Sequence, residues 1–115
     1  MTEHDHQSLL MVWASHRIGI YPELKLLYAT PNGGKRHIGV AKKLKKEGVR
    51  AGVPDLFLPC AKKGYHGFFI EMKAEKGAVS EAQKNWIRLL SEQGFKVDVC
   101  YGWEAAKDAL IEYLS

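Results

Sequence analysis

Phe68-Phe69-Ile70-Glu71-Met72-Lys73 is the stretch that decides the fold, because it places two charged residues at the end of an apolar, strand-like run. Side chains alternate between the two faces of a strand, so Glu71 and Lys73 project to one face and Ile70 and Met72 to the other. Burying an unpaired carboxylate among apolar residues costs several kcal/mol, so such acids are normally paired, solvated or bound to a metal. The sequence therefore predicts that the chemistry lies on the Glu71 side of this strand.

A second apolar run, Val53-Pro54-Asp55-Leu56-Phe57-Leu58, precedes the first and carries an acid near its start. The intervening residues 61–67 are mostly polar and contain two glycines, so they can close a hairpin loop. Antiparallel pairing would bring Asp55 near Glu71, and two converging carboxylates repel each other unless a cation lies between them. Carboxylate oxygens suit a hard divalent ion such as Mg²⁺, and a neighbouring lysine can orient water or stabilise negative charge.

Ordered motifs extend this pattern over nearly the whole chain. They are Pro31-Asn32-Gly33-Gly34-Lys35-Arg36, then Gly48-Val49-Arg50-Ala51-Gly52-Val53-Pro54-Asp55, then Glu71-Met72-Lys73, then Gln83-Lys84-Asn85-Trp86. Together they resemble the PD-(D/E)xK nuclease signature and, within that superfamily, the stand-alone VRR-NUC (virus-type replication-repair nuclease) domain. The resemblance implies an α/β fold with a restriction-endonuclease-like core, a four-stranded mixed sheet flanked by helices, and a single nuclease domain over residues 1–115.

Periodicity and capping signals predict the individual elements. We expect a helix from about residue 3 to 16 with Thr2 as a cap, a strand over 24–29, a loop at 30–34, a basic helix near 39–47 ending at Gly48, the hairpin, a helix between Ser80 and Gly94, a strand over 95–101 and a helix over 103–114. Periodicity gives these elements but not their pairing, which is implied by the resemblance.

The resemblance also implies roles for the hairpin residues. Asp55 and Glu71 would be Mg²⁺ ligands, with Mn²⁺ expected to substitute, and the main-chain carbonyl of Met72 would supply a further oxygen. Lys73 would position or activate the attacking water and stabilise the transition state. The alternatives are a turn-forming role for Asp55 and, for Glu71 with Lys73, an exposed ion pair contributing under about 1 kcal/mol.

Two further residues are assigned to the site by the resemblance. Glu3 resembles the first-helix acid that completes the metal site in VRR-NUC-like domains, although an acid in a first turn is also explained by the helix dipole and could belong to a frayed end. Gln83 resembles the glutamine that orders the catalytic site, although its position three residues after Ser80 also fits a capping box. His4 and His6 are two residues apart on the expected helix and face different directions, so a metal role is not expected for them.

Basic residues gather between residues 35 and 50, where seven Lys or Arg accompany one acid, Glu47. A positive field beside an acidic pair suits a phosphodiester substrate, although a solvated helix face explains any charge run taken alone. The predicted nucleic-acid contacts are Asn32, Lys35, Arg36, Lys42, Lys43, Lys46 and Arg50.

The composition indicates a small intracellular domain with a net charge of +4. There is no membrane-length apolar run, no signal-peptide pattern and no metal or redox spacing of Cys60 and Cys100, so we expect a cytoplasmic protein of a bacterial or phage-infected cell. The predicted function is a Mg²⁺-dependent, structure-selective DNA endonuclease resembling Holliday-junction resolvases. A homodimer acting on branched DNA is expected, because one chain carries one site and paired incisions need two. A non-catalytic nucleic-acid-binding module of the same fold and an RNA-directed nuclease stay open as alternatives.

Overall fold

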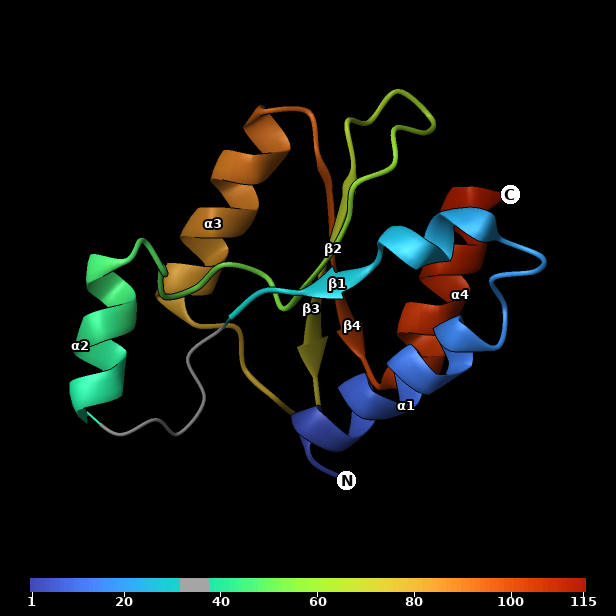
Figure 1. Ribbon diagram of the computed structural model, residues 1–115. Coiled ribbons are helices and arrows are strands. Elements are labelled where there is room, and N and C mark those ends of the chain that lie inside the picture. Colours follow the sequence, from blue (N-terminus) through green and yellow to red (C-terminus); the bar gives the residue numbers. More distant parts are fainter. Residues whose placement is uncertain (32–37) are drawn as a thin grey trace.

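The computed structural model describes residues 1–31 and 38–115, apart from the side chains of residues 38, 39 and 41. A four-stranded sheet runs through the centre, with helices on both of its faces (Figure 1). The elements in chain order are α1 (Glu3–Ser15), the 3₁₀ helix η1 (Pro22–Leu26), β1 (Tyr28–Ala29), α2 (Ile38–Lys46), β2 (Leu56–Leu58), β3 (Phe68–Lys73), α3 (Glu81–Glu92), β4 (Lys96–Tyr101) and α4 (Trp103–Leu114).

The sheet has the strand order β1-β2-β3-β4 and is mixed. Strands β2 and β3 form the expected antiparallel hairpin, with Leu56 opposite Ile70 and Phe57 opposite Phe69, and β1 pairs with β2 in the same sense. Strand β4 pairs with β3 in parallel, after the chain has crossed over through α3. The predicted fold class, a four-stranded mixed sheet flanked by helices around a restriction-endonuclease-like core, is therefore confirmed.

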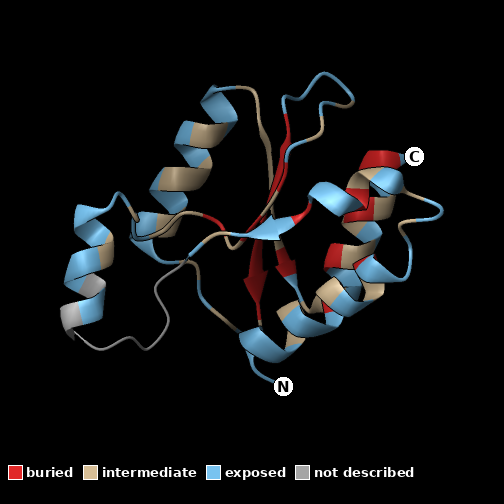
Figure 2. Cartoon of the chain, in the orientation of Figure 1, coloured by how far each residue is buried: buried red, intermediate tan, exposed pale blue. Residues whose placement is uncertain are grey.

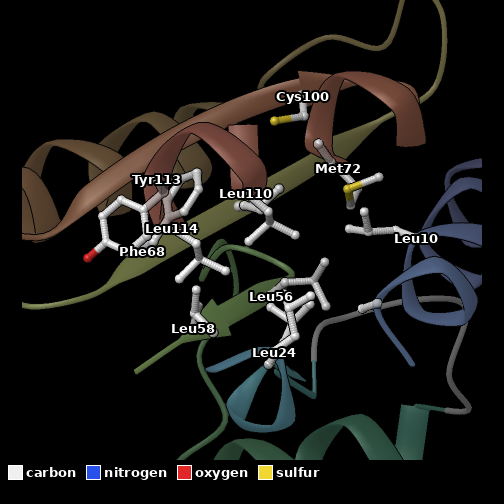
Figure 3. Packing of buried hydrophobic residues seen from close by; sticks show 14 residues of the cluster. Leu10, Leu24, Leu56, Leu58, Phe68, Met72, Cys100, Leu110, Tyr113 and Leu114 are labelled. Carbon is white, nitrogen blue, oxygen red and sulfur yellow. The ribbon is translucent and has the colours of Figure 1, made fainter. Parts of the chain in front are cut away.

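The apolar core fills the space between the sheet and helices α1 and α4 (Figure 3). Strand β3 contributes Phe68, Ile70 and Met72, all fully buried, and these pack against helix residues such as Leu10 and Leu110. This confirms the predicted alternation along β3, since the residues at even positions face the core. The charged residues of the strand consequently face the other side.

The opposite face of the sheet is covered by α3, and α2 lies beyond α3 as seen from the sheet (Figure 1). Phe57 and Phe69 stack on this face with ring centroids 4.1 Å apart. In α3, every residue of which is described, none is buried, whereas the residues of β3 are buried along the whole strand (Figure 2). This side is thus packed more openly than the α1 and α4 side.

The expected strand over residues 24–29 is wrong in its first half. Pro22–Leu26 form a 3₁₀ helix, and only Tyr28–Ala29 are a strand. Leu24 and Leu27 are both buried, while Leu26 is half exposed. A 3₁₀ helix has three residues per turn, so it brings Leu24 and Leu27 to the same side, whereas a strand would place them on opposite faces. Pro22 at the start favours the turn because its ring fixes φ.

Among the described helices, none combines the length and the apolar character that crossing a membrane requires.

Candidate active site

A cleft of about 480 Å³ opens at the carboxyl end of β3, on the sheet face that carries α3. Its lining comes from the first turns of α1, from Thr30 after β1, from the loop that leads into β2, from β3 and from the start of α3. Five separate segments therefore converge on one hollow, which is the place where the sequence predicted the chemistry to lie.

Three acids meet in this cleft. Glu3, Asp55 and Glu71 each present a carboxylate oxygen, and these oxygens all lie within 4.8 Å of one another. Their exposure is graded: Glu71 is 1% exposed, Asp55 is half-buried and Glu3 is exposed. An ion held among them would have protein beneath it and an open side toward the cleft, and all-oxygen donors of this kind suit Mg²⁺ or Mn²⁺.

One oxygen of Glu71 supports the fit to a cation. Glu71 Oε1 is buried and accepts no hydrogen bond from the described residues. A buried acceptor without a donor costs roughly 1–3 kcal/mol, and more when it is charged. Coordination of a metal ion would satisfy that oxygen, so the donor set matches the predicted metal site.

Asp55 is positioned from both neighbouring strands. The Met72 main-chain N–H donates to Asp55 Oδ2 at 2.7 Å, which ties the carboxylate to β3. On the other side the Thr30 N–H donates to the Asp55 carbonyl at 2.8 Å, and the Thr30 hydroxyl donates to the Pro54 carbonyl at 2.6 Å. Thr30 was not predicted as a site residue, because it acts on main-chain atoms and leaves no pattern of its own in the sequence.

Met72 contributes to the site through its main chain. Its side chain is fully buried in the core on the other face of β3 (Figure 3). Only its peptide groups can take part on the cleft side, and its N–H already holds Asp55. The role of its carbonyl as a metal ligand stays a prediction.

Glu3 lies at the first position of α1, where the helix start is well fixed. The Thr2 hydroxyl accepts from the Asp5 N–H at 3.1 Å, and the Asp5 carboxylate accepts from the Thr2 N–H at 2.9 Å. This capping box satisfies N–H groups that an uncapped helix end leaves free. The first turn that carries Glu3 is therefore an ordered part of α1 and not a frayed end.

Lys73 and Glu71 form a buried pair. Lys73 is 5% exposed, its Nζ lies 3.5 Å from Glu71 Oε2, and it donates to Gln83 Oε1 at 3.0 Å. The alternative of an exposed surface ion pair is therefore wrong. Gly77 lies over the lysine stem, since a Cβ at that position would be 3.2 Å from Lys73 Cδ.

Gln83 serves the helix and the ion pair together. Its Oε1 accepts from the Ser80 N–H at 2.9 Å, while its own N–H donates to the Ser80 hydroxyl at 3.1 Å, which completes a capping box at the start of α3. Its Nε2 donates to Glu71 Oε2 at 3.0 Å. Both interpretations of this glutamine, as a helix cap and as a residue that orders the site, agree with the structure.

Gly52 packs the loop before β2 against α3. It has φ +92°, and a Cβ there would lie 2.7 Å from the carbonyl carbon of Ala82. Any larger residue would push the loop that leads to Asp55 away from the helix that carries Gln83. The close backbone approach thus fixes the distance between two walls of the cleft.

The electrostatics of the cleft favour a cation. Burial and, after it, the nearby Asp55 carboxylate together raise the pKa of Glu71 to about 8, although Lys73 partly offsets both. Without a cation the site therefore retains a proton near neutral pH. A bound divalent ion would displace that proton and keep the Glu71 carboxylate ionised.

The predicted nucleic-acid contacts are not gathered at the acids. Lys42, Lys43 and Lys46 are exposed on α2, and the described lining of the cleft includes no residue of that helix. Arg50 is exposed and precedes Ala51, which does line the cleft. Asn32, Lys35 and Arg36 lie outside the described residues.

Comparison with known proteins agrees with this geometry. The family model of the VRR-NUC domain matches residues 2–104. A solved structure of a VRR_NUC domain protein superposes with a TM-score of 0.83 at 28% sequence identity, covering 99% of this chain and 88% of the other. A Fanconi-associated nuclease 1 homolog from Arabidopsis thaliana is 42% identical over 53 residues, which are 44% of this chain and 6% of that protein.

The sheet topology and the acidic cleft define a nuclease-type α/β domain. The chain belongs to the VRR-NUC domain family. It spans only a small part of the plant relative, so the resemblance to that protein concerns one segment.

Proposed function

We propose that this chain, acting as one domain over residues 1–115, is a Mg²⁺-dependent DNA endonuclease that hydrolyses phosphodiester bonds. The observation that carries the proposal is the cleft in which the carboxylates of Glu3, Asp55 and Glu71 converge beside the buried ammonium group of Lys73. Membership of the VRR-NUC family supports a nuclease, and the all-oxygen donor set supports a hard divalent cation.

Each residue has a role in this proposal. Glu3, Asp55 and Glu71 would hold the ion, and the Met72 carbonyl would supply a further oxygen. The bound ion would supply Lewis-acid charge and a water of lowered pKa as the nucleophile. Lys73, held by Gln83, hydrogen-bonds the attacking water and stabilises negative charge as it develops on the phosphate.

The substrate side of the proposal is branched DNA, including four-way junctions, cut by a homodimer. The exposed lysines of α2 together with Arg50 would contact the DNA backbone outside the acidic cleft, and Asn32, Lys35 and Arg36 would add contacts from the preceding stretch of sequence. Two copies would place two sites on one junction, because the described residues of one 13.0 kDa chain hold one cluster of acids that could bind an ion. Reducing cytoplasm of a bacterial or phage-infected cell would suit the two free thiols, Cys60 and Cys100.

The role of Lys73 is tested by Lys73→Ala. We expect DNA cleavage to fall at least about 100-fold, because a buried donor beside the reacting phosphate is lost, while DNA binding stays near that of the wild type. Lys84→Ala is the matched control, since Lys84 is an exposed lysine of α3 that pairs with Glu81. Full cleavage by Lys73→Ala would refute the assigned role.

The substrate class is tested with end-labelled linear, flap, fork and four-way DNA, each incubated with Mg²⁺ and with a chelator. Branched DNA should be cut faster than linear DNA, and the chelator should abolish cutting. Faster cleavage of a matched RNA junction would favour the RNA-directed alternative. DNA binding without cleavage in both Mg²⁺ and Mn²⁺ would favour the non-catalytic module. Analytical ultracentrifugation of the protein bound to a four-way junction tests the dimer, and a complex that contains a single 13.0 kDa chain would contradict it.

A further inference from the structure

His6 makes a contact that the proposed reaction does not use. It lies one helical turn after Glu3 on α1, and its Nδ1 accepts a hydrogen bond from the Trp103 main-chain N–H at 3.1 Å. The two residues are 97 positions apart in the sequence. Because a main-chain N–H can only donate, Nδ1 carries no proton, and the neutral ring holds its proton on Nε2.

This contact supplies a cap that α4 lacks within its own sequence. The residue before α4 is Gly102, which has φ +93° and no side chain with which to cap the helix. The His6 ring lies against it, since a Cβ at Gly102 would be 3.6 Å from His6 Cε1. The imidazole from α1 therefore satisfies the first N–H of another helix.

The same junction is bonded to the end of β3. The Gly102 N–H donates to the Lys73 carbonyl at 2.9 Å, immediately before the Trp103 N–H that reaches His6. Two successive main-chain N–H groups thus join the strand that carries Glu71 and Lys73 to the helix that carries Glu3. This gives a short path of hydrogen bonds between the two sides of the acidic cluster.

We propose that His6 is a positioning residue that sets the Glu3 carboxylate relative to Glu71, an inference that rests on the proposed metal site. The buried contacts of α1 are at Leu10 and Ala14, which lie about 10 Å or more along the helix from Glu3 at 1.5 Å per residue. Apolar contacts are non-directional and leave the near end of a helix free to shift. The directional bond of His6, about 4.5 Å along the helix from Glu3, removes that freedom.

The test uses three substitutions that separate the acceptor from the bulk of the ring. His6→Ala removes the acceptor. His6→Asn places an oxygen at the position of Nδ1, because Oδ1 and Nδ1 are both bonded to Cγ. His6→Gln places its oxygen one bond further out and misses that position. His16→Ala is the matched control, since His16 is an exposed histidine at the other end of α1.

Two readouts are measured on the full chain: Mn²⁺ affinity by titration calorimetry and, without metal, the hydrogen exchange of the Trp103 amide. His6→Ala and His6→Gln should weaken Mn²⁺ binding about 10-fold and speed up Trp103 exchange, as expected for loss of a residue that orients a ligand. His6→Asn and His16→Ala should stay close to the wild type in both. Glu3→Gln should weaken Mn²⁺ binding, and adding His6→Ala to it should change the affinity no further, because both changes act through the same carboxylate.

Wild-type Mn²⁺ affinity in His6→Ala, or fully additive effects in the double variant, would overturn the inference. Equal Mn²⁺ affinities of His6→Asn and His6→Gln would overturn it too, and this pair decides the matter if His6→Ala does not fold. A wild-type chain that binds no Mn²⁺ would instead remove the proposed metal site, and the inference would fall with it. The two failures are thus distinguished by the wild-type titration.

Discussion

Strand β3 is buried on both faces, yet the two faces differ in what they bury. Phe68, Ile70 and Met72 belong to the apolar core under α1 and α4, whereas Glu71 and Lys73 are buried beside α3 at 1% and 5% exposure. The first face gains stability from every group it removes from water. The second removes charge from water, which is costly unless the charges are paired and hydrogen-bonded.

The helix that covers the second face explains how the charges are kept there. Gln83 of α3 donates to the carboxylate and accepts from the ammonium group, so one amide bridges both charges. The remaining oxygen, Glu71 Oε1, has no hydrogen bond from the described residues. The comparison therefore separates a face that stabilises the fold from a face that leaves one buried carboxylate oxygen without a hydrogen bond from the described residues.

The largest expected change in stability comes from the apolar face. Ile70→Ala should lower the free energy of unfolding by about 2–5 kcal/mol, because it leaves a cavity in a fully buried layer. Denaturant unfolding measures the change, and Leu89→Ala, at a site of α3 that is 39% exposed, is the control. Per folded molecule, cleavage by Ile70→Ala should match the wild type. A loss of stability below about 1 kcal/mol would show that this face does not hold the fold as described.

The charged face should make the metal-free protein lose stability as the pH rises. The pKa of Glu71 is raised in the folded chain from 4.5 to about 8, so the folded state binds more protons between these values and its stability falls across that window. Each pH unit changes stability by about 1.4 kcal/mol, so on the order of 3 kcal/mol is lost between about pH 5.5 and about pH 7.5.

Glu71→Gln isolates this effect, because the amide cannot titrate while the other groups still do. The difference in unfolding free energy between Glu71→Gln and the wild type should grow with pH in a chelator and shrink when Mg²⁺ is added to the wild type. If the difference in unfolding free energy between Glu71→Gln and the wild type stayed constant between about pH 5.5 and about pH 7.5, the raised pKa of Glu71 would be contradicted.

A smaller effect is expected at Thr30, which supports Asp55 without touching the charged pair. Thr30→Val keeps the shape but removes the hydroxyl that donates to the Pro54 carbonyl, and should cost about 1 kcal/mol of stability. Cleavage should fall about 10-fold, since the peptide next to Asp55 loses a support. Thr30→Ser retains the donor and should recover most of both losses. Equal stability and equal cleavage rates of Thr30→Val and Thr30→Ser would show that the hydroxyl does not position Asp55.

The sequence carried enough information to place the hairpin and its charges. The alternation in β3 put Glu71 opposite the core, and the antiparallel register brought Asp55 to it. The capping signal at Ser80 predicted the place of Gln83 at the start of α3, whereas Glu3 was assigned to the site by the resemblance to VRR-NUC domains. The alternation along β3 and the cap at Ser80 are patterns that one segment displays by itself, whereas the pairing of the strands and the place of Glu3 were implied by the family resemblance.

The residues that escaped prediction act on distant main-chain atoms. Thr30 bonds to residues 54 and 55, and His6 bonds to residue 103, so neither pairing is visible within a single segment. The 3₁₀ helix η1 escaped because alternating leucines at 24 and 26 imitate a strand, while the buried pair is Leu24 and Leu27. Tertiary packing decided between the two patterns.

The contact between Gly52 and Ala82 has a consequence for how a substrate enters. Where two stretches of backbone meet without a side chain between them, no rotamer change can open a passage. We expect the approach to Asp55 from the α3 side to be rigid. Because the first turn of α1 on the opposite side is held by its capping box and by the bond from Trp103 to His6, the cleft should keep its width when an ion enters.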